Sequence, residues 1–287
     1  MLKGHIDIMA LTHHSLKIGY VPLIDSAPLL VAEHEGFFLD EGVRVTLSEE
    51  VGWATVRDKL IHNELDMAST IIGLPYAMHN GVGCFQTEVA IPLIINANGN
   101  TVCLSRDIPE ESLQSPETLA QALNARVGDS GRKWTFATVN PYSTHLIMLF
   151  RWLSQYLKGY IGEIDIVFCP PQLAPQLLEE GMIDGFCAGE PWGSIAEGTK
   201  AGRTVATSID LNENHPEKVL TVPSATLEFK RDAVTAACRA IYRALPLCDA
   251  ADYQATLCKV LAAKPALGMT AKMVKQCLHV PSQTRQG

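Results

Sequence analysis

Six short segments of the chain carry the polar and aromatic residues whose types could do chemistry. They lie where predicted strands end and predicted helices begin, which is where an open α/β sheet places its ligand site. The segments are IGYVPLIDSAPLLVAEHEGFF (18–38), GWATVRDKL (52–60), NANGN (96–100), NPYSTH (140–145), IDGFCAGEPW (183–192) and NHPEKVL (214–220). Amides, hydroxyls, imidazoles and a lysine predominate, and these groups hold a ligand by hydrogen bonds and charge.

The sequence lacks the short motifs on which common enzyme classes depend. No GxSxG elbow follows a predicted strand, and neither a P-loop nor a GxGxxG is present. No HExxH occurs, and we expect no functional metal site at the His13 and His14 pair near the start of the chain. The sequence therefore predicts a binding protein with no catalytic residues, cofactor or metal.

Strands and helices alternate along the part of the chain that would position these segments. Strands are predicted over 16–21, 43–49 and 66–71, and helices over 27–40, 53–63 and 74–80. This βαβαβ order predicts a parallel sheet covered by helices. Residues 89–105 form a long extended stretch interrupted by NANGN, and we interpret it as the crossover into a second lobe.

A second set of elements repeats the pattern. Helices are predicted over 116–124, 143–157, 173–180 and from Trp192, and strands over 135–139, 164–169 and 184–188. A return segment over 204–209 then leads to residues 215–222 and a mainly helical tail. The helix over 143–157 has its predicted buried face at Leu146, Leu149, Phe150, Leu153 and Leu157. We expect an α/β protein of two lobes, 16–100 with 205–287 and 101–204, with the ligand cleft between them.

Composition narrows the class of protein further. The 287 residues are 47% hydrophobic and 19% charged, which suits two packed domains at roughly 150 residues each. The net charge of −8, without a block of Lys or Arg, predicts no direct contact with nucleic acid. Charge and histidines interrupt the N-terminus, and no apolar run approaches the roughly 18 residues of a spanning helix. We expect a soluble protein without a membrane segment.

The eight cysteines are scattered through apolar segments without a CxxC pair. We interpret them as reduced core thiols, because free cysteine is among the most buried residue types. Together with the N-terminus they predict a cytoplasmic protein, with the periplasm as the alternative if a leader lies outside this sequence.

Taken in order, the six segments resemble the nitrate- and bicarbonate-binding proteins of ABC transporters. They resemble still more the cytoplasmic nitrate/nitrite sensor related to them, which controls an RNA-binding antiterminator. The resemblance runs from about Leu16 to Val222. It implies a two-lobed periplasmic-binding-protein-like fold of type II and a small anion as the ligand.

By position, the resemblance places the anion contacts on six residues, which are Trp53, Asn98, Tyr142, His145, Gly189 and Lys218. Asn98 stands where the nitrate transporter protein has glutamine and Tyr142 where it has histidine, so nitrate, nitrite and bicarbonate all stay open. The residue chemistry agrees with this assignment, because a buried anion needs several donors and preferably a positive group. Asn98, Tyr142 and His145 offer donors, Gly189 a reachable backbone N–H, and Lys218 the charge.

Each of these residues also has a structural interpretation. Trp53 fits a helix core and Asn98 a turn. Ser143 and Thr144 are good N-caps, which leaves His145 as an ordinary residue of the first helical turn.

Gly189 is suited to the turn that leads into Pro191, and Lys218, which follows the tripeptide HPE, fits a solvated lysine. Glu190 next to Gly189 would repel nitrate but could accept a proton from bicarbonate, or could simply favour the start of the Trp192 helix.

Three functions remain in competition. The first is a cytoplasmic nitrate or nitrite sensor in which anion binding closes the lobes and signals to a partner, the RNA-binding antiterminator of the resembling sensor. The alternative is the substrate-binding component of a nitrate or bicarbonate ABC transporter. The third is an enzyme on the same scaffold, similar to the thiamine-pyrimidine synthases, although their cysteine-rich iron motif is missing.

Overall fold

A computed structural model describes residues 15–212 and 214–278 of the chain. His13, His14 and the tail after Leu278 lie outside the described residues. The chain divides into two compact units. Unit 1 takes in residues up to Pro22, Ser26–Asn96 and Lys218–Gly268, and unit 2 takes in Leu23–Asp25, Ala97–Glu217 and the residues from Met269.

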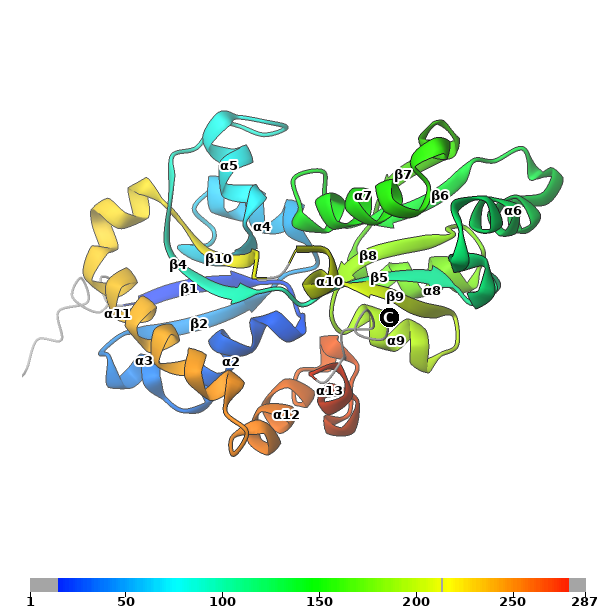
Figure 1. The fold of residues 1–287 in the computed structure, drawn as a ribbon. Coiled ribbons are helices and arrows are strands. Elements are labelled where there is room, and N and C mark those ends of the chain that lie inside the picture. The colour runs from blue at the N-terminus through cyan, green and yellow to red at the C-terminus, as the bar shows by residue number, and fades with distance from the viewer. Residues whose placement is uncertain (1–14, 213, 279–287) are drawn as a thin grey trace, which may run out of the picture. The chain divides into compact units, whose positions relative to one another are not determined.

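Unit 1 is built on a five-stranded mixed sheet (Figure 1). In spatial order its strands are β2 (Arg44–Glu49), β1 (Ser15–Tyr20), β3 (Met67–Ile71), β10 (Pro216–Pro223) and β4 (Val89–Ala97). β1 pairs in parallel with β2 and β3, whereas β10 runs antiparallel to β3. The predicted βαβαβ arrangement therefore forms the parallel part, and the later strands add an antiparallel part that the sequence did not indicate.

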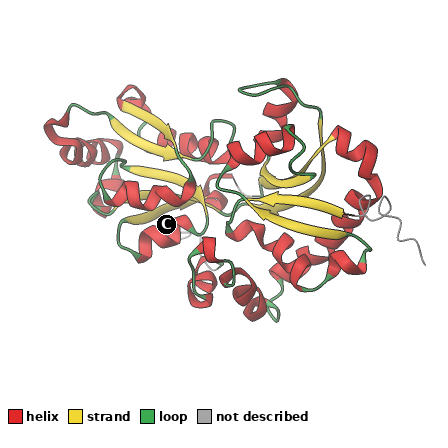
Figure 2. Ribbon diagram, turned by 180° about the vertical axis from the view of Figure 1, so that it is seen from behind, coloured by secondary structure: helices red, strands yellow, loops and turns green. Residues whose placement is uncertain are grey.

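Helices cover both faces of the unit 1 sheet (Figures 1 and 2). They are α2 (Ala27–His34), α3 (Phe37–Asp40), α4 (Trp53–Ile61), α5 (Gly73–Asn80), α11 (Ser224–Asp249) and α12 (Gln254–Ala262). The single helix predicted over 27–40 is wrong. Gly36, with φ of 76°, adopts a left-handed conformation that ends α2 and lets α3 start in a new direction.

Unit 2 repeats the architecture with its own five-stranded mixed sheet. The spatial order is β7 (Ile164–Phe168), β6 (Trp134–Thr138), β8 (Gly185–Gly189), β5 (Asn100–Ser105) and β9 (Gly202–Thr207). β6 is parallel to β7 and β8, while β5 is antiparallel to β8 and β9. The sheet is therefore mixed, with β5 as the strand that runs against both of its neighbours.

The helices of unit 2 are α6 (Pro116–Val127), α7 (Thr144–Tyr156), α8 (Ala174–Glu179), α9 (Trp192–Gly198), α10 (Ser208–Asn212) and α13 (Ala271–Cys277). α6 and α7 share one hydrophobic core with the sheet, and α8 and α9 lie over its other face (Figure 1). The predicted buried face of α7 is partly wrong. Phe150 is 43% exposed, whereas Met148 and Trp152 are buried beside Leu149 and Leu153. Burying the large indole of Trp152 turns the helix face away from Phe150.

The unit boundaries differ from the predicted lobes at two places. Residues 205–217 belong to unit 2, because β9 pairs with β5 and α10 packs on α7. Helix α13 also belongs to unit 2, where it packs on α9. The strand predicted over 184–188 lies within one residue of β8, and the return segment over 204–209 overlaps β9.

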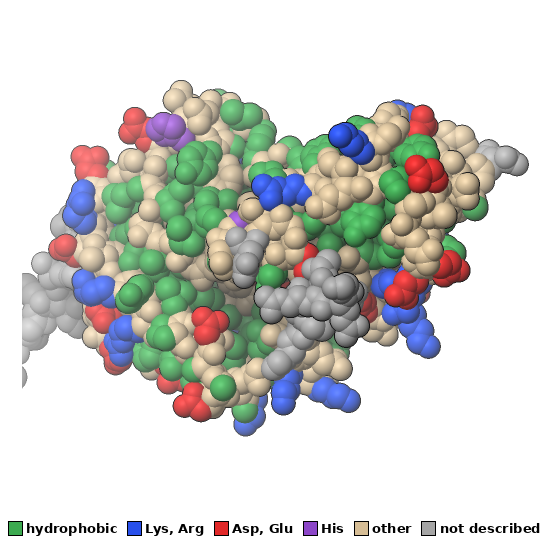
Figure 3. Space-filling model, viewed as in Figure 1, with side chains coloured by type: hydrophobic (Ala, Val, Ile, Leu, Met, Phe, Trp, Pro, Cys, Tyr) green, Lys and Arg blue, Asp and Glu red, His purple; other side chains and the backbone are tan. Residues whose placement is uncertain are grey.

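Two surface properties follow from the described residues. No helix among residues 15–212 and 214–278 is long and apolar enough to cross a membrane. On the face shown in Figure 3, Lys and Arg side chains are scattered among acidic ones and do not gather into one basic field.

The eight cysteines are all free thiols, and Cys103, Cys187, Cys258 and Cys277 are buried.

Candidate functional site

Three polar side chains of unit 2 converge on Gly189 at the end of β8. A methyl group placed on this glycine would lie 3.5 Å from Asn100 Oδ1, 3.5 Å from Asp25 Oδ2 and 3.6 Å from His145 Nε2. Asn100 reaches this place because it is the register partner of Gly189 where β5 pairs with β8. The absent side chain of Gly189 therefore leaves a small space whose walls are an amide, a carboxylate and an imidazole.

The N-terminus of α7 places His145 in this group. Ser143 is the N-cap, and its side chain accepts a hydrogen bond from the backbone N–H of Leu146. Asn140 O accepts from the Ser143 hydroxyl at 2.6 Å, which fixes the approach to the helix. Thr144 and His145 then occupy the first turn, where unpaired backbone N–H groups give the helix its positive end. His145 is fully buried there.

Glu217 is a buried carboxylate behind these residues, and its side chain is 0% exposed. Its Oε2 accepts hydrogen bonds from Asn100 Nδ2 at 2.7 Å and from the Thr144 hydroxyl. His215 Nε2 lies 3.2 Å from the same oxygen, and His145 Nε2 lies 3.7 Å from Oε1. We call Asn100, Thr144, His145, His215 and Glu217 the Glu217 cluster.

Asn98 and Asn100 have different positions, although they stand two residues apart. Asn98 occupies a left-handed turn with φ of 64°, and its Oδ1 accepts from the backbone N–H of Asn214 at 3.1 Å. Asn100 is 1% exposed, and its Oδ1 has no hydrogen-bond partner within the described part of the chain. The predicted site residue Asn98 is thus held as a turn former, and Asn100 is the amide that faces Gly189.

Tyr142 stands just before the N-cap of α7. Its backbone N–H donates to Asn140 Oδ1 at 2.9 Å, and its side chain is half-buried. It therefore belongs to the turn that leads into the helix, one turn before His145.

The other two predicted residues form a pair in unit 1. Trp53 opens α4 and is 3% exposed, and Lys218 on β10 is fully buried. Lys218 Nζ lies 5.4 Å from the centre of the Trp53 ring, within the range of a cation–π interaction. The structural interpretation of Lys218 as a solvated lysine is wrong, because no part of its side chain reaches solvent.

Glu190 follows Gly189 and is buried, with 6% of its surface exposed. Its Oε2 accepts from the backbone N–H of Ser194 at 3.2 Å, and the peptide bond to Pro191 is cis. Burial raises the pKa of the Glu190 carboxyl to about 7, against the lowering effect of its hydrogen bonds with Ser194. This carboxyl can therefore exchange a proton near neutral pH.

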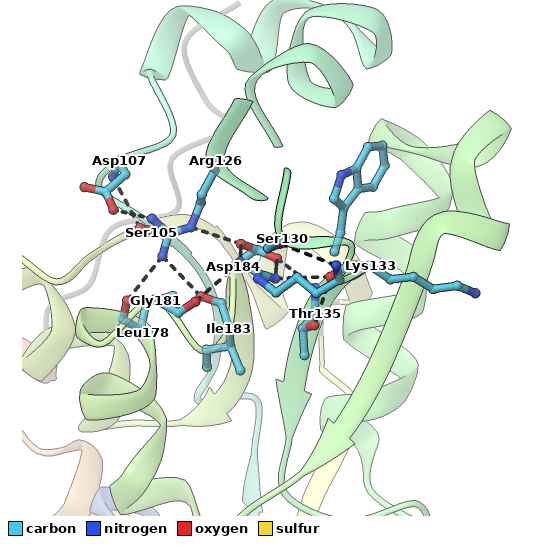
Figure 4. A network of polar contacts seen from close by, with 12 residues as sticks. Ser105, Asp107, Arg126, Ser130, Lys133, Thr135, Leu178, Gly181, Ile183 and Asp184 are labelled. Carbon is cyan, nitrogen blue, oxygen red and sulfur yellow. Dashed lines mark hydrogen bonds and ion pairs between the residues drawn. The ribbon is translucent and has the colours of Figure 1, made fainter. Parts of the chain in front are cut away.

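A second buried carboxylate, Asp184, lies at the opposite end of β8 (Figure 4). Arg132 binds it with both terminal nitrogens at 2.7 Å, and Arg126 Nε adds a contact at 3.0 Å. The backbone N–H of Thr135 donates to it at 2.8 Å. The contact with Asp184 raises the pKa of the Arg132 guanidinium, which is the response expected of a tight ion pair.

Sequence reasoning missed Asn100, Asp25, Thr144, His215 and Glu217. A signal existed for two of them. His215 and Glu217 stand two residues apart in the segment 215–222, and residues at this spacing share one face if the segment is a strand. Asn100 lies in the NANGN segment that was singled out, but the local pattern does not tell which asparagine turns inward.

Comparison with known proteins shows which family the chain belongs to. The model of the NMT1-like family matches residues 10–262 of the chain. The nitrate import ATP-binding protein NrtC of Synechocystis sp. is 30% identical over 262 residues, which cover 91% of this chain and 39% of NrtC. The nitrate/nitrite binding protein NrtA of Synechococcus elongatus is 27% identical over 254 residues, covering 85% of this chain and 57% of NrtA. The chain thus spans about two fifths to three fifths of these relatives.

Solved structures define the fold class. The crystal structure of the periplasmic nitrate-binding protein NrtA from Synechocystis matches with a TM-score of 0.83 at 22% identity, over 92% of this chain and 70% of that one. The periplasmic aliphatic sulphonate binding protein SsuA from Escherichia coli matches with a TM-score of 0.66 at 16% identity, over 92% and 82% of the two chains. The fold is that of the periplasmic binding proteins, with two α/β units. The chain belongs to the NMT1-like family.

Proposed function

We propose that this protein binds a small oxyanion, nitrate or nitrite, with the residues that converge on Gly189. The single observation that carries this proposal is the group of polar atoms around Gly189, where Asn100 Oδ1, Asp25 Oδ2 and His145 Nε2 surround the missing side chain and His145 stands in the first turn of α7. An oxyanion accepts hydrogen bonds from the N–H of the His145 imidazole and from the free N–H groups of a helix N-terminus. The names of the relatives, which import or bind nitrate, support the choice of ligand.

The six contacts predicted from the sequence, Trp53, Asn98, Tyr142, His145, Gly189 and Lys218, enter this proposal with different support. His145 and Gly189 lie together in unit 2, and Asn100 replaces Asn98 as the proposed amide contact. Lys218 supplies a buried positive charge in unit 1 beside Trp53, which makes both residues worth testing as anion contacts. Tyr142 is retained as a predicted contact on the family resemblance alone.

Thermal unfolding with nitrate, nitrite, bicarbonate and chloride at matched ionic strength tests the proposal. A free anion at 100 times its dissociation constant stabilises the folded protein by about 2.7 kcal/mol. Gly189→Ala should abolish the stabilisation, because the new methyl occupies the proposed anion position. The protein itself should tolerate it, since the methyl meets its neighbours at ordinary contact distances of 3.5 to 3.6 Å.

Gly185→Ala, at the other end of the same strand, is the matched control. Its methyl would lie 2.8 Å from the backbone oxygen of Cys103, so we expect a loss of stability of about 1–3 kcal/mol. It should nevertheless still bind nitrate. If nitrate stabilises wild type and Gly189→Ala equally, the anion does not bind at Gly189. If none of the four anions stabilises the wild type, the proposal is rejected.

Two physiological roles fit such a site. In the first, the protein is a cytoplasmic sensor that reports nitrate or nitrite to an RNA-binding antiterminator protein. In the second, it is the substrate-binding part of a nitrate or bicarbonate ABC transporter, which the similarity to NrtC and to the bicarbonate transport protein CmpC favours. If the amount of antiterminator that co-purifies with this protein changes when nitrate is added, the sensor role is supported. If nitrate stimulates ATP hydrolysis when this protein is mixed with the transporter components, the second role is supported.

A further inference from the structure

Glu217 introduces a negative charge into the region that the proposed function assigns to an anion. Its Oε1 lies 3.7 Å from His145 Nε2, and the same nitrogen would lie 3.6 Å from a methyl group on Gly189. His145 thus stands between the carboxylate and the proposed anion position. Like charges in a buried environment raise each other's energy, so an anion at this position disfavours the ionised form of Glu217.

The titratable and charged groups around Glu217 come from several elements. Near Glu217 itself they are His145 on α7, His215 ahead of β10, Cys187 on β8 and Lys218 next along β10. Next to Gly189 they are Asp25, on the short helix Ile24–Ser26, and Glu190, which follows the glycine in the chain. Burial, with a further contribution from the charge of Glu217, raises the pKa of the Cys187 thiol well above its ordinary value, so it stays protonated. Cys187 therefore adds no charge to this group, and the carboxylates and imidazoles are the groups with a lone pair that can accept a proton.

We infer that unit 2 binds its anion together with a proton, which the Glu217–His145–His215 group takes up. This inference rests on the proposed function and adds a second ligand to it. While Glu217 is ionised, its Oε1 competes with the anion for the N–H of His145 Nε2. A proton on Glu217 ends the competition, and a proton on either imidazole balances the added negative charge.

The linkage has a definite sign. An anion in front of Gly189 favours the more positive, protonated form of the cluster by direct electrostatic attraction. By reciprocity, the proton strengthens anion binding by the same factor. Nitrate affinity therefore rises as the pH falls, by up to about tenfold per pH unit while one proton is taken up.

Isothermal titration calorimetry with sodium nitrate tests this on the wild-type chain. Titrations at about pH 6, 7 and 8, each in two buffers of different ionisation enthalpy, give the number of protons taken up per nitrate. We expect uptake that approaches one proton at a pH within this range. Nitrate binding with no proton exchange and no change of affinity with pH overturns this inference and leaves the proposed function intact.

Variants assign the proton to its group. Glu217→Gln keeps an oxygen that can accept from Asn100 and Thr144 but cannot ionise, so proton uptake and the pH dependence of the affinity should both fall. Any uptake that remains belongs to the imidazoles of His145 and His215. Glu180→Gln, an exposed carboxylate of unit 2, is the matched control and should behave as wild type. Glu190→Gln should retain the uptake.

Loss of proton uptake in Glu190→Gln with its retention in Glu217→Gln contradicts the assignment to the Glu217 group. Absence of nitrate, nitrite and bicarbonate binding by wild type at every pH rejects the proposed function, and this inference falls with it. Should Glu217→Gln not fold, the buffer comparison on wild type still decides whether a proton accompanies the anion.

Discussion

Unit 2 contains two fully buried carboxylates whose surroundings differ in kind. Asp184 is held by the guanidinium groups of Arg126 and Arg132, which keep their charge at every physiological pH (Figure 4). The partners of Glu217 include an amide, a hydroxyl and two imidazoles. The first arrangement holds one charge state and stabilises the fold, whereas the second can change its charge when a ligand arrives. The difference separates a structural ion pair from a group suited to binding.

Asp184→Asn should give the largest effect of the substitutions considered. It leaves two guanidinium groups beside a neutral amide, and losing one partner of a buried ion pair costs about 3–5 kcal/mol. Chemical denaturation with urea measures the loss. Asp165→Asn is the control, because its contact with Lys133 is an exposed pair at 4.0 Å worth about 1 kcal/mol or less. Similar losses in both variants would contradict the structural role of the Asp184 cluster.

Glu190 provides an intermediate case, and it predicts a pH dependence of stability. Its carboxyl has a pKa of about 7 in the folded protein, above its ordinary value of 4.5. Between these values the folded state binds more protons than the unfolded state, so stability falls as the pH rises. From about pH 5 to pH 8 the wild type should lose about 2.5 kcal/mol relative to Glu190→Gln. Parallel pH profiles of the two unfolding free energies would contradict this prediction.

Glu217→Gln should cost less stability than Asp184→Asn. Asn100 and Thr144 retain an oxygen acceptor in the variant, and the expected loss of about 1–2 kcal/mol is that of weakened hydrogen bonds. Denaturation of the two variants under identical conditions compares them. A loss for Glu217→Gln as large as that for Asp184→Asn would show that both carboxylates are structural, and the contrast between the two clusters would not hold.

The sequence predicted the order of strands and helices well, because local periodicity carries that information. Strand β3 begins one residue from its predicted start, and α4 begins at its predicted residue, Trp53. Periodicity alone was less useful for α7, where two helical stripes were equally well spaced. The stripe through Met148 and Trp152 forms the core because it buries the larger side chains.

Two of the predicted site residues lie close together in the structure, and the neighbours that the sequence did not indicate share a physical cause. His145 and Gly189 were identified from the family resemblance, and they lie together in the structure. Glu217 and Asn100 are 117 residues apart and lie on strands of different sheets, so only the folded chain shows that their side chains meet. Within a strand, residues two apart point to the same side. Asn98 and Asn100 do not follow this rule, because Asn98 lies in the left-handed turn that precedes β5.

Trp53 has a spectroscopic consequence that follows from the buried pair it forms with Lys218. The four tryptophans of the chain are Trp53, Trp134, Trp152 and Trp192, and the last three belong to unit 2. Replacing those three with phenylalanine would leave one indole as the source of tryptophan fluorescence. Because an ammonium lies 5.4 Å from its ring centre, the emission wavelength of Trp53 responds to the local electric field. The protein thereby carries an optical reporter of charge in unit 1 without any added dye.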